Sequence, residues 1–151
     1  MSGIKSVPAA HYAGDVSPAE AWRVLNETSK AQLVDVRTSA EWQFVGLPDL
    51  SPLGRRPLLA EWQIWPDMTV DPGFAQDVDA ALGAAGVAKS DPVFLLCRSG
   101  ARSRAAAVAL TAAGYGAAYN VANGFEGDPD GEGHRGSLNG WKADGLPWRQ
   151  G

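Results

Sequence analysis

We infer the fold first from one stretch of the chain, Pro92-Val93-Phe94-Leu95-Leu96-Cys97-Arg98-Ser99-Gly100-Ala101-Arg102-Ser103. Its residues 92–96 are apolar throughout, which is typical of a central strand covered on both faces. Cys97 stands at the carboxyl end of this strand, and the alanine-rich run 104–113 predicts that a helix follows. Open α/β sheets bind ligands outside the carboxyl ends of their strands. The loop 98–103 is therefore the expected functional site.

Two helices upstream are predicted from capping signals. The segment Ser17–Glu20 combines an N-cap serine, a proline at the first helical position and a glutamate placed for a capping box. We expect this helix to end near Glu27. The sequence Thr38-Ser39-Ala40-Glu41 repeats the capping-box pattern directly after the segment 32–36, which is expected to be a short buried strand. A strand followed at once by a short helix forms a βα unit.

The remaining segments continue the alternation of strands and helices. A helix is predicted to start at Asp71-Pro72 and to end between Gly83 and Gly86, with an apolar stripe that faces the sheet, Phe74, Val78 and Leu82. Residues 118–121 are expected to form a strand, and Trp141 is expected to anchor a last helix. The whole chain, 1–151, is predicted to be a single α/β domain with a doubly wound, mostly parallel sheet flanked by helices on both faces.

Charge and composition exclude several classes of function. A formal net charge of -4 and a pI near 5.1 argue against nucleic-acid partners. The sequence has no apolar run long enough to cross a bilayer and no secretory pattern at its start, so we expect a cytoplasmic protein without a membrane partner. Because Cys97 is the single cysteine, an internal disulfide and a cysteine-based zinc site are excluded. We expect no metal and no cofactor.

The loop after Cys97 has the composition of an anion site. Backbone N–H groups converge where a tight loop opens a helix, and Gly100 lets the backbone turn without a Cβ clash. Arg98 and Arg102 can add full positive charges. The positive electrostatic potential of these groups should stabilise Cys97 as a nucleophilic thiolate, and it should stabilise a persulfide on Cys97 in the same way. The alternative is a small buried apolar residue at a strand end, which is the usual role of a free cysteine.

The chain resembles rhodanese domains over nearly its whole length. The resemblance is carried, in order, by Leu33-Val34-Asp35-Val36-Arg37-Thr38-Ser39-Ala40-Glu41-Trp42, by 93–103, and by Gly114-Tyr115, Asn120-Val121, Gly124-Phe125 and Gly145-Leu146-Pro147-Trp148. It implies a thiosulfate sulfurtransferase-like enzyme. Such an enzyme moves sulfane sulfur from a small anionic donor such as thiosulfate to cyanide, a thiol or a protein acceptor.

The resemblance also assigns roles to individual residues. Cys97 matches the sulfur carrier, and the covalent persulfide on it needs no cofactor. The matching cradle around that sulfur consists of Arg98, Ser99, Gly100, Ala101, Arg102 and Ser103. Within it, Arg102 would also help to hold an anionic donor. Asp35 and Arg37 match a strand-end pair, for which we expect a supporting ionic role.

Two departures from the family pattern lie near the expected entrance. Gly46-Leu47-Pro48-Asp49 replaces the usual glycine-histidine-isoleucine-proline stretch, and it opens an insert at about 46–72 in which a short strand is possible at Trp62–Trp65. A second insert, 127–136, adds His134 and Arg135 as candidate rim residues. His134 would act as a general acid or base, and Arg135 would bind the donor; the alternative is that both are exposed loop residues.

Two other functions are possible on such a scaffold. A phosphatase or arsenate reductase also uses a cysteine in an amide-lined loop, but those enzymes resemble a C-x5-R pattern, and Arg102 comes one place earlier here. A non-catalytic binding or sensing module is the other alternative, because a fold does not fix a function. The shorter loop better fits a single sulfur atom than a phosphate, and the intact cysteine and the two loop arginines weaken the case for a binding module.

Overall fold

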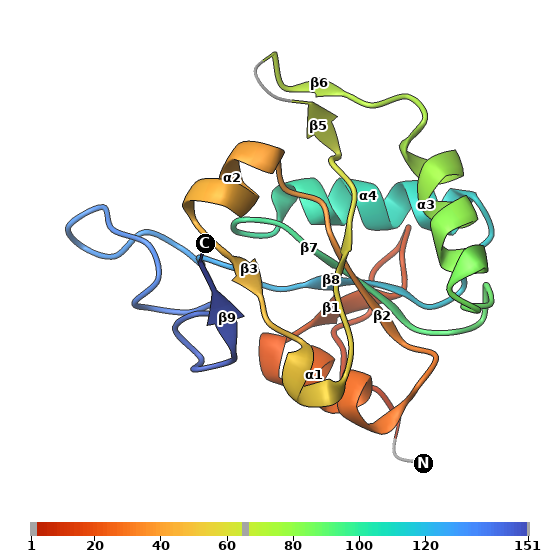
Figure 1. The fold of residues 1–151 in the computed structure, drawn as a ribbon, viewed down its shortest axis with the longest axis horizontal. Helices are drawn as coiled ribbons and strands as arrows, with labels where there is room; N and C mark the ends of the chain where they lie inside the picture. The colour runs from red at the N-terminus through yellow and green to blue at the C-terminus, as the bar shows by residue number, and fades with distance from the viewer. Residues whose placement is uncertain (1–2, 65–66, 151) are drawn as a thin grey trace.

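A five-stranded parallel sheet forms the centre of the computed structural model, which describes residues 3–64 and 67–150 (Figure 1). Each neighbouring pair in the order β1-β8-β7-β2-β4 runs parallel. The strands are β1 (Gly14–Val16), β2 (Gln32–Asp35), β4 (Leu58–Leu59), β7 (Val93–Leu96) and β8 (Ala118–Val121). The strands predicted at 32–36, 92–96 and 118–121 are therefore confirmed as β2, β7 and β8.

Helices cover both faces of this sheet. In Figure 1, α1 (Pro18–Glu27) lies on one side, and α3 (Phe74–Ala84) and α4 (Ala101–Ala112) lie on the other. Two shorter elements, α2 (Ser39–Phe44) and the 3-10 helix η1 (Ser51–Leu53), flank it. The predicted doubly wound α/β fold class is confirmed.

The central strand β7 divides its side chains between two cores. Val93 and Leu95 pack in the cluster that includes α3 and α4, whereas Phe94 and Leu96 pack in the cluster that includes α1. All four are fully buried, and burial of such side chains stabilises the fold by about 1.5–3 kcal/mol each. Since both faces are covered, the strand has no polar alternation, and Cys97 is fixed where it ends.

The capping predictions hold in part. Thr38 and Glu41 form both halves of a capping box at α2. At α1 the Ser17 side chain accepts from the Glu20 N–H, but the Glu20 carboxylate binds Lys5 and Arg23 instead of returning to the cap. That reciprocal half of the predicted box was wrong, because an arginine one turn on offers the carboxylate a charged partner.

Two helices begin at other residues than predicted. Helix α3 starts at Phe74, because the Asp71 side chain accepts from the Gly73 N–H ahead of it, and the predicted stripe Phe74, Val78 and Leu82 is buried. Helix α4 starts at Ala101, three residues early, because Gly100 with φ of 120° serves as its N-cap. The second half of the predicted loop 98–103 is therefore the first helical turn.

The described residues between α2 and α3 form four short strands. The strand expected at 62–65 is β5 (Gln63–Ile64), which pairs antiparallel with β6 (Thr69–Val70), and Trp65 lies outside the described residues. Strand β3 (Leu47–Pro48) pairs with β9 (Trp148–Arg149) near the end of the chain. This segment also supplies β4 to the main sheet.

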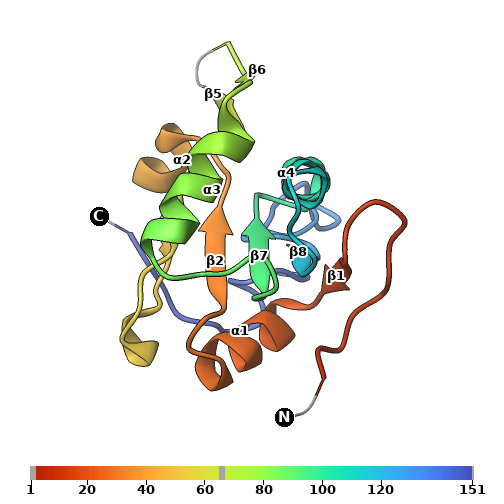
Figure 2. The ribbon, with the colours of Figure 1, turned by 90° about the vertical axis from the view of Figure 1, so that its right-hand side faces the viewer.

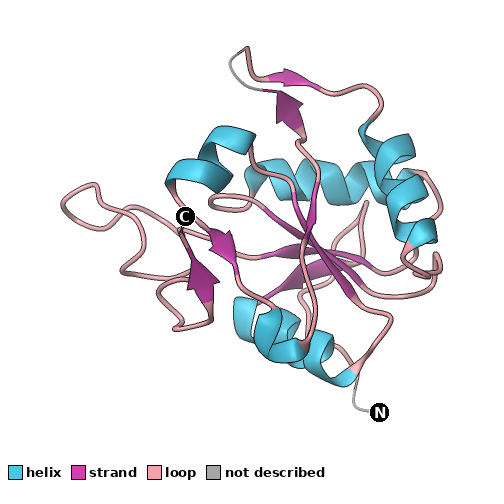
Figure 3. Ribbon diagram, viewed as in Figure 1, coloured by secondary structure: helices cyan, strands magenta, loops and turns pink. Residues whose placement is uncertain are grey.

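No helix follows β8 within the part of the chain that the structure describes, so the last helix expected at Trp141 was wrong. Figure 3 shows the connection from β8 to β9 as loop. Gly140 and Gly145 turn the chain with φ of 96° and 77°, and Trp141 is buried in the core between them. Among the described residues, no helix is long and apolar enough to span a membrane.

Candidate active site

Several of the predicted site residues lie together at the carboxyl ends of β7 and β2. Figure 2 shows β2 and β7 side by side, pointing toward the end of the molecule where α2 and the β5–β6 hairpin lie. A cavity of about 640 Å³, here called the Cys97 cavity, opens at this end. The residues that line it are Thr38, Ala40, Glu41, Val45, Gln63, Met68, Cys97, Arg98, Ser99, Ala101, Arg102, Glu126 and Arg135.

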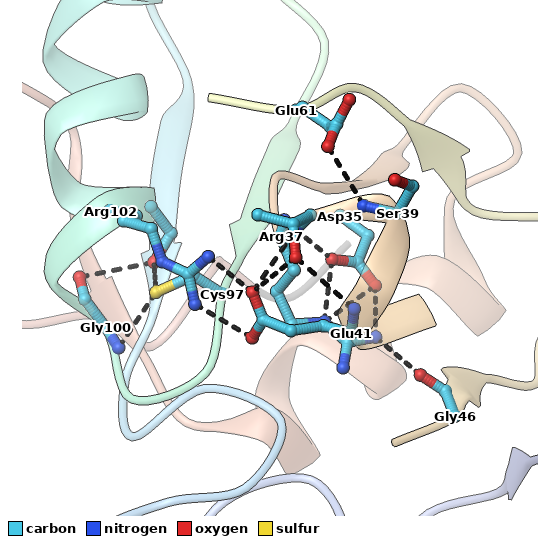
Figure 4. A network of polar contacts seen from close by, with 11 residues as sticks. Asp35, Arg37, Ser39, Glu41, Gly46, Glu61, Cys97, Gly100 and Arg102 are labelled. Atoms are coloured by element: carbon cyan, nitrogen blue, oxygen red, sulfur yellow. Dashed lines mark hydrogen bonds and ion pairs between the residues drawn. The ribbon is translucent and has the colours of Figure 1, made fainter. Parts of the chain in front are cut away.

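The sulfur of Cys97 lies at the start of α4 (Figure 4). Cys97 is only 1% exposed, and its Sγ accepts a hydrogen bond from the Gly100 N–H at 3.1 Å. The N–H groups of the first turn of a helix have no acceptor within the helix, and no side chain caps α4 to supply one. They give this end of the helix a partial positive charge. Cys97 thus lies between the end of β7 and the uncapped start of α4.

Ser103 contacts the same sulfur from the first turn of α4. Its Oγ lies 3.2 Å from Cys97 Sγ, 3.2 Å from the Gly100 carbonyl oxygen and 2.5 Å from Asn120 Oδ1. The Asn120 amide donates to Asp15 Oδ1 at 2.8 Å, and since that oxygen only accepts, the Asn120 oxygen must face Ser103. A hydroxyl has one proton, so Asn120 competes with the sulfur for it. Sequence reasoning missed Asn120 and Asp15 at this site.

Backbone hydrogen bonds hold the cysteine loop from behind. The Phe125 N–H donates to the Cys97 carbonyl at 2.7 Å, and the N–H groups of Glu126 and Gly127 donate to the Arg98 carbonyl at 3.0 and 3.1 Å. Gly124 has φ of 64°, and a Cβ there would lie 2.4 Å from the Cys97 carbonyl oxygen. This close approach requires glycine.

Asp35 and Arg37 form a fully buried ion pair next to the site, outside the lining of the cavity. Arg37 Nε and Nη2 donate to the Asp35 carboxylate, and Nη2 also donates to the Gly46 carbonyl at 2.8 Å. The guanidinium lies over the Phe125 ring, 4.2 Å from its centroid. The pair thus connects the end of β2 to the turn before β3. This geometry suits a supporting role.

Arg102, predicted to hold an anionic donor, is engaged by a carboxylate of the protein. Its Nη1 and Nη2 donate to Glu41 Oε1 and Oε2 at 2.6 and 2.9 Å (Figure 4). The side chains are 17% and 19% exposed. Burial raises the pKa of Glu41, but the hydrogen bonds and charge of Arg102 outweigh it and leave that pKa below its ordinary value.

Glu41 is thus a site residue that the sequence reasoning assigned only to a helix cap. The sequence signal for a place of Glu41 at the site was indirect. Glu41 belongs to a capping box directly after a strand end, and the edge of the sheet where that strand ends also carries Cys97.

The remaining candidates, Arg98, Arg135 and His134, differ in how they lie relative to the Cys97 cavity. Arg98 is exposed at the cavity, and Arg135 lines it while donating to the Gly127 carbonyl at 2.6 Å. His134 is outside the lining, with its side chain 74% exposed.

Within the ranges 3–64 and 67–150, no group of three or more histidine, cysteine, aspartate and glutamate side chains is placed to hold a metal ion.

Comparison with known proteins places the chain in a family. The family model described as the STR4 middle domain matches residues 13–151. The chain belongs to the STR4 middle-domain family. Relatives of this STR4 middle-domain chain include the uncharacterized protein RP600 homolog of Rickettsia rickettsii, 35% identical over 135 residues, and the uncharacterized protein RC0915 of Rickettsia conorii, 36% identical over 135 residues. Both alignments cover 89% of this chain and 96% of the relative.

Solved structures share the architecture. The crystal structure of Rv0390 from M. tuberculosis is 51% identical, with a TM-score of 0.80 over 93% of this chain and 99% of that one. The solution structure of the polysulfide-sulfur transferase homodimer from Wolinella succinogenes is 21% identical, with a TM-score of 0.54 over 91% of this chain and 78% of that one. The second likeness is one of fold alone.

Proposed function

We propose that this chain is a sulfurtransferase of the rhodanese type that carries sulfane sulfur as a persulfide on Cys97. In the first step the Cys97 thiolate attacks the outer sulfur of a donor. With thiosulfate, a bond forms between Sγ and that sulfur, the sulfur–sulfur bond of the donor breaks, and sulfite leaves with the bonding electron pair. In the second step an acceptor such as cyanide takes the outer sulfur as thiocyanate, and Cys97 returns as thiolate.

The observation that carries this proposal is the position of Cys97 Sγ at the uncapped start of α4. The Gly100 N–H already binds Sγ at 3.1 Å, and because no side chain caps α4, the N–H groups of its first turn are available to stabilise charge on the outer sulfur. Hydrogen bonds from the chain after β8 hold the carbonyls of Cys97 and Arg98 from behind, which limits how far the start of the loop must reorganise when the charge forms.

The acceptor must come from outside the chain. With a single cysteine, the protein has no second thiol that could resolve the persulfide. Cyanide, a small thiol or a thiol on another protein can each take the sulfur, and we propose no resident cofactor, metal, nucleic acid or membrane partner for the reaction. Turnover then alternates between a free and a sulfur-loaded form.

Mass spectrometry of the intact protein tests the proposal. Incubation with thiosulfate, or with an organic persulfide, should add the mass of one sulfur atom, and cyanide should remove it. The nearly isosteric variant Cys97→Ser should gain no mass with either donor. Absence of a cyanide-sensitive adduct with both donors would refute the carrier role, as would an adduct that persists in Cys97→Ser.

A further inference from the structure

The charged side chains that line the Cys97 cavity nearly balance one another in number. Three guanidinium groups belong to its described lining, those of Arg98, Arg102 and Arg135. Two carboxylates, Glu41 and Glu126, line it as well. A thiolate on Cys97 adds a further negative charge. The positive and negative charges therefore match in number, and none is in excess to hold two negative charges of a ligand.

Glu41 is fixed where it neutralises Arg102. Besides its two bonds to that guanidinium, Oε1 accepts from the Thr38 N–H at 3.2 Å and from the Thr38 hydroxyl at 3.1 Å. The next N–H, that of Ser39, is held at 3.0 Å by the Glu61 carboxylate. A movement of Glu41 away from Arg102 would also break the cap of α2. A ligand therefore meets the Glu41 carboxylate and does not find a free Arg102.

We propose that Glu41 is a specificity-determining residue that selects sulfur donors by charge. It disfavours dianions such as thiosulfate, because they would approach a fixed carboxylate and compete with it for Arg102. It favours donors whose sulfane sulfur sits on an uncharged carbon group, that is, organic or protein-bound persulfides. This inference rests on the proposed sulfurtransferase function and defines the class of its donor.

The chemistry of such a donor balances without an oxidant or a reductant. The Cys97 thiolate attacks the outer sulfur of R–S–SH, a bond forms between Sγ and that sulfur, and the bond between the two donor sulfurs breaks. The products are the Cys97 persulfide, which keeps the proton, and the thiolate of R. Apolar side chains in the cavity lining are available to contact R, namely Ala40, Val45 and Met68.

The test compares loading of Cys97 from two probes, thiosulfate and the persulfide of 2-mercaptoethanol, as second-order rates. In Glu41→Gln the thiosulfate rate relative to the persulfide rate should rise about tenfold or more, because a fixed negative charge is removed and Arg102 is released. Glutamine is also accepted at this capping-box position, so α2 is retained. Glu126→Gln is the matched control: it removes a cavity carboxylate that makes no bond to Arg102, and should change the ratio much less.

Two further measurements separate the possible failures. The double variant Glu41→Gln/Arg102→Gln should return the ratio toward that of the wild type, because the gain acts through Arg102. The wild-type rate with thiosulfate should depend weakly on ionic strength, and this measurement needs no variant to fold. A ratio unchanged in Glu41→Gln, an equal gain in Glu126→Gln or a steep salt dependence would overturn the inference. Failure of the wild type to load from either probe would instead refute the proposed function.

Discussion

Replacing Gly124 by alanine is the sharpest structural test of how the cysteine loop is supported. The added Cβ would lie 2.4 Å from the Cys97 carbonyl oxygen and 2.6 Å from the Arg98 carbonyl carbon and oxygen. These are backbone atoms, so the two segments must separate, and the three hydrogen bonds from residues 125–127 must lengthen or break.

The magnitude follows from two contributions to the free energy of unfolding. A left-handed backbone costs a non-glycine residue about 1–2 kcal/mol. Three lost hydrogen bonds add about 1 kcal/mol each, so Gly124→Ala should destabilise the protein by about 4–5 kcal/mol. That is a large part of the about 5–15 kcal/mol typical of a folded domain.

Urea denaturation of Gly124→Ala and Gly54→Ala separates the cost of the steric clash from the cost of the backbone strain. Gly54 has a nearly identical φ of 68°, but a Cβ there would have no atom within 4 Å. Gly54→Ala should therefore cost only the backbone strain, about 1–2 kcal/mol. Equal losses of unfolding free energy in the two variants would refute the argument that the contact with the cysteine loop is what requires glycine.

Two other predictions concern the ion pairs. Asp35→Asn should lower the free energy of unfolding by about 3–5 kcal/mol, because it leaves the Arg37 guanidinium buried without its counter-charge; a loss under about 1 kcal/mol in thermal or urea denaturation would contradict the supporting role. The Glu41–Arg102 pair should stabilise the wild type over Glu41→Gln by about 1.5–3 kcal/mol near neutral pH. Because folding lowers the pKa of Glu41 from 4.5, this difference should be fully present above that value and disappear as the pH falls through the folded pKa; a difference independent of pH would exclude the carboxylate as its source.

The parts of the site that sequence predicts well are those set by local patterns. The apolar run 92–96 places Cys97 at a strand end because a strand covered on both faces needs no polar residue. The cap of α2 is equally local, since Thr38 and Glu41 are three residues apart. Both follow from backbone geometry within one or two turns of chain.

What sequence could not predict depends on long-range contacts. Strand β4 has two residues and β1 has three, too few to show a period, and each is defined only by its partner in the sheet. Glu41 and Arg102 are 61 positions apart, and no spacing rule links them. The prediction of a helix at Trp141 was wrong for a related reason: a tryptophan can be buried from a turn as well as from a helix, so its burial does not determine the local structure.

The segments that hold Cys97 differ from several of those that line the cavity around it. The Cys97 sulfur is held by β7, the start of α4 and the turn at Gly124, whereas another part of the cavity lining comes from α2, from Gln63 and Met68 and from the loop that carries Arg135. These outer segments contribute none of the hydrogen bonds found at Sγ. Under the proposed function, changes in these outer segments would alter which molecules reach Cys97 without altering the hydrogen bonds at its sulfur, so one sulfur-transfer chemistry could serve many substrates.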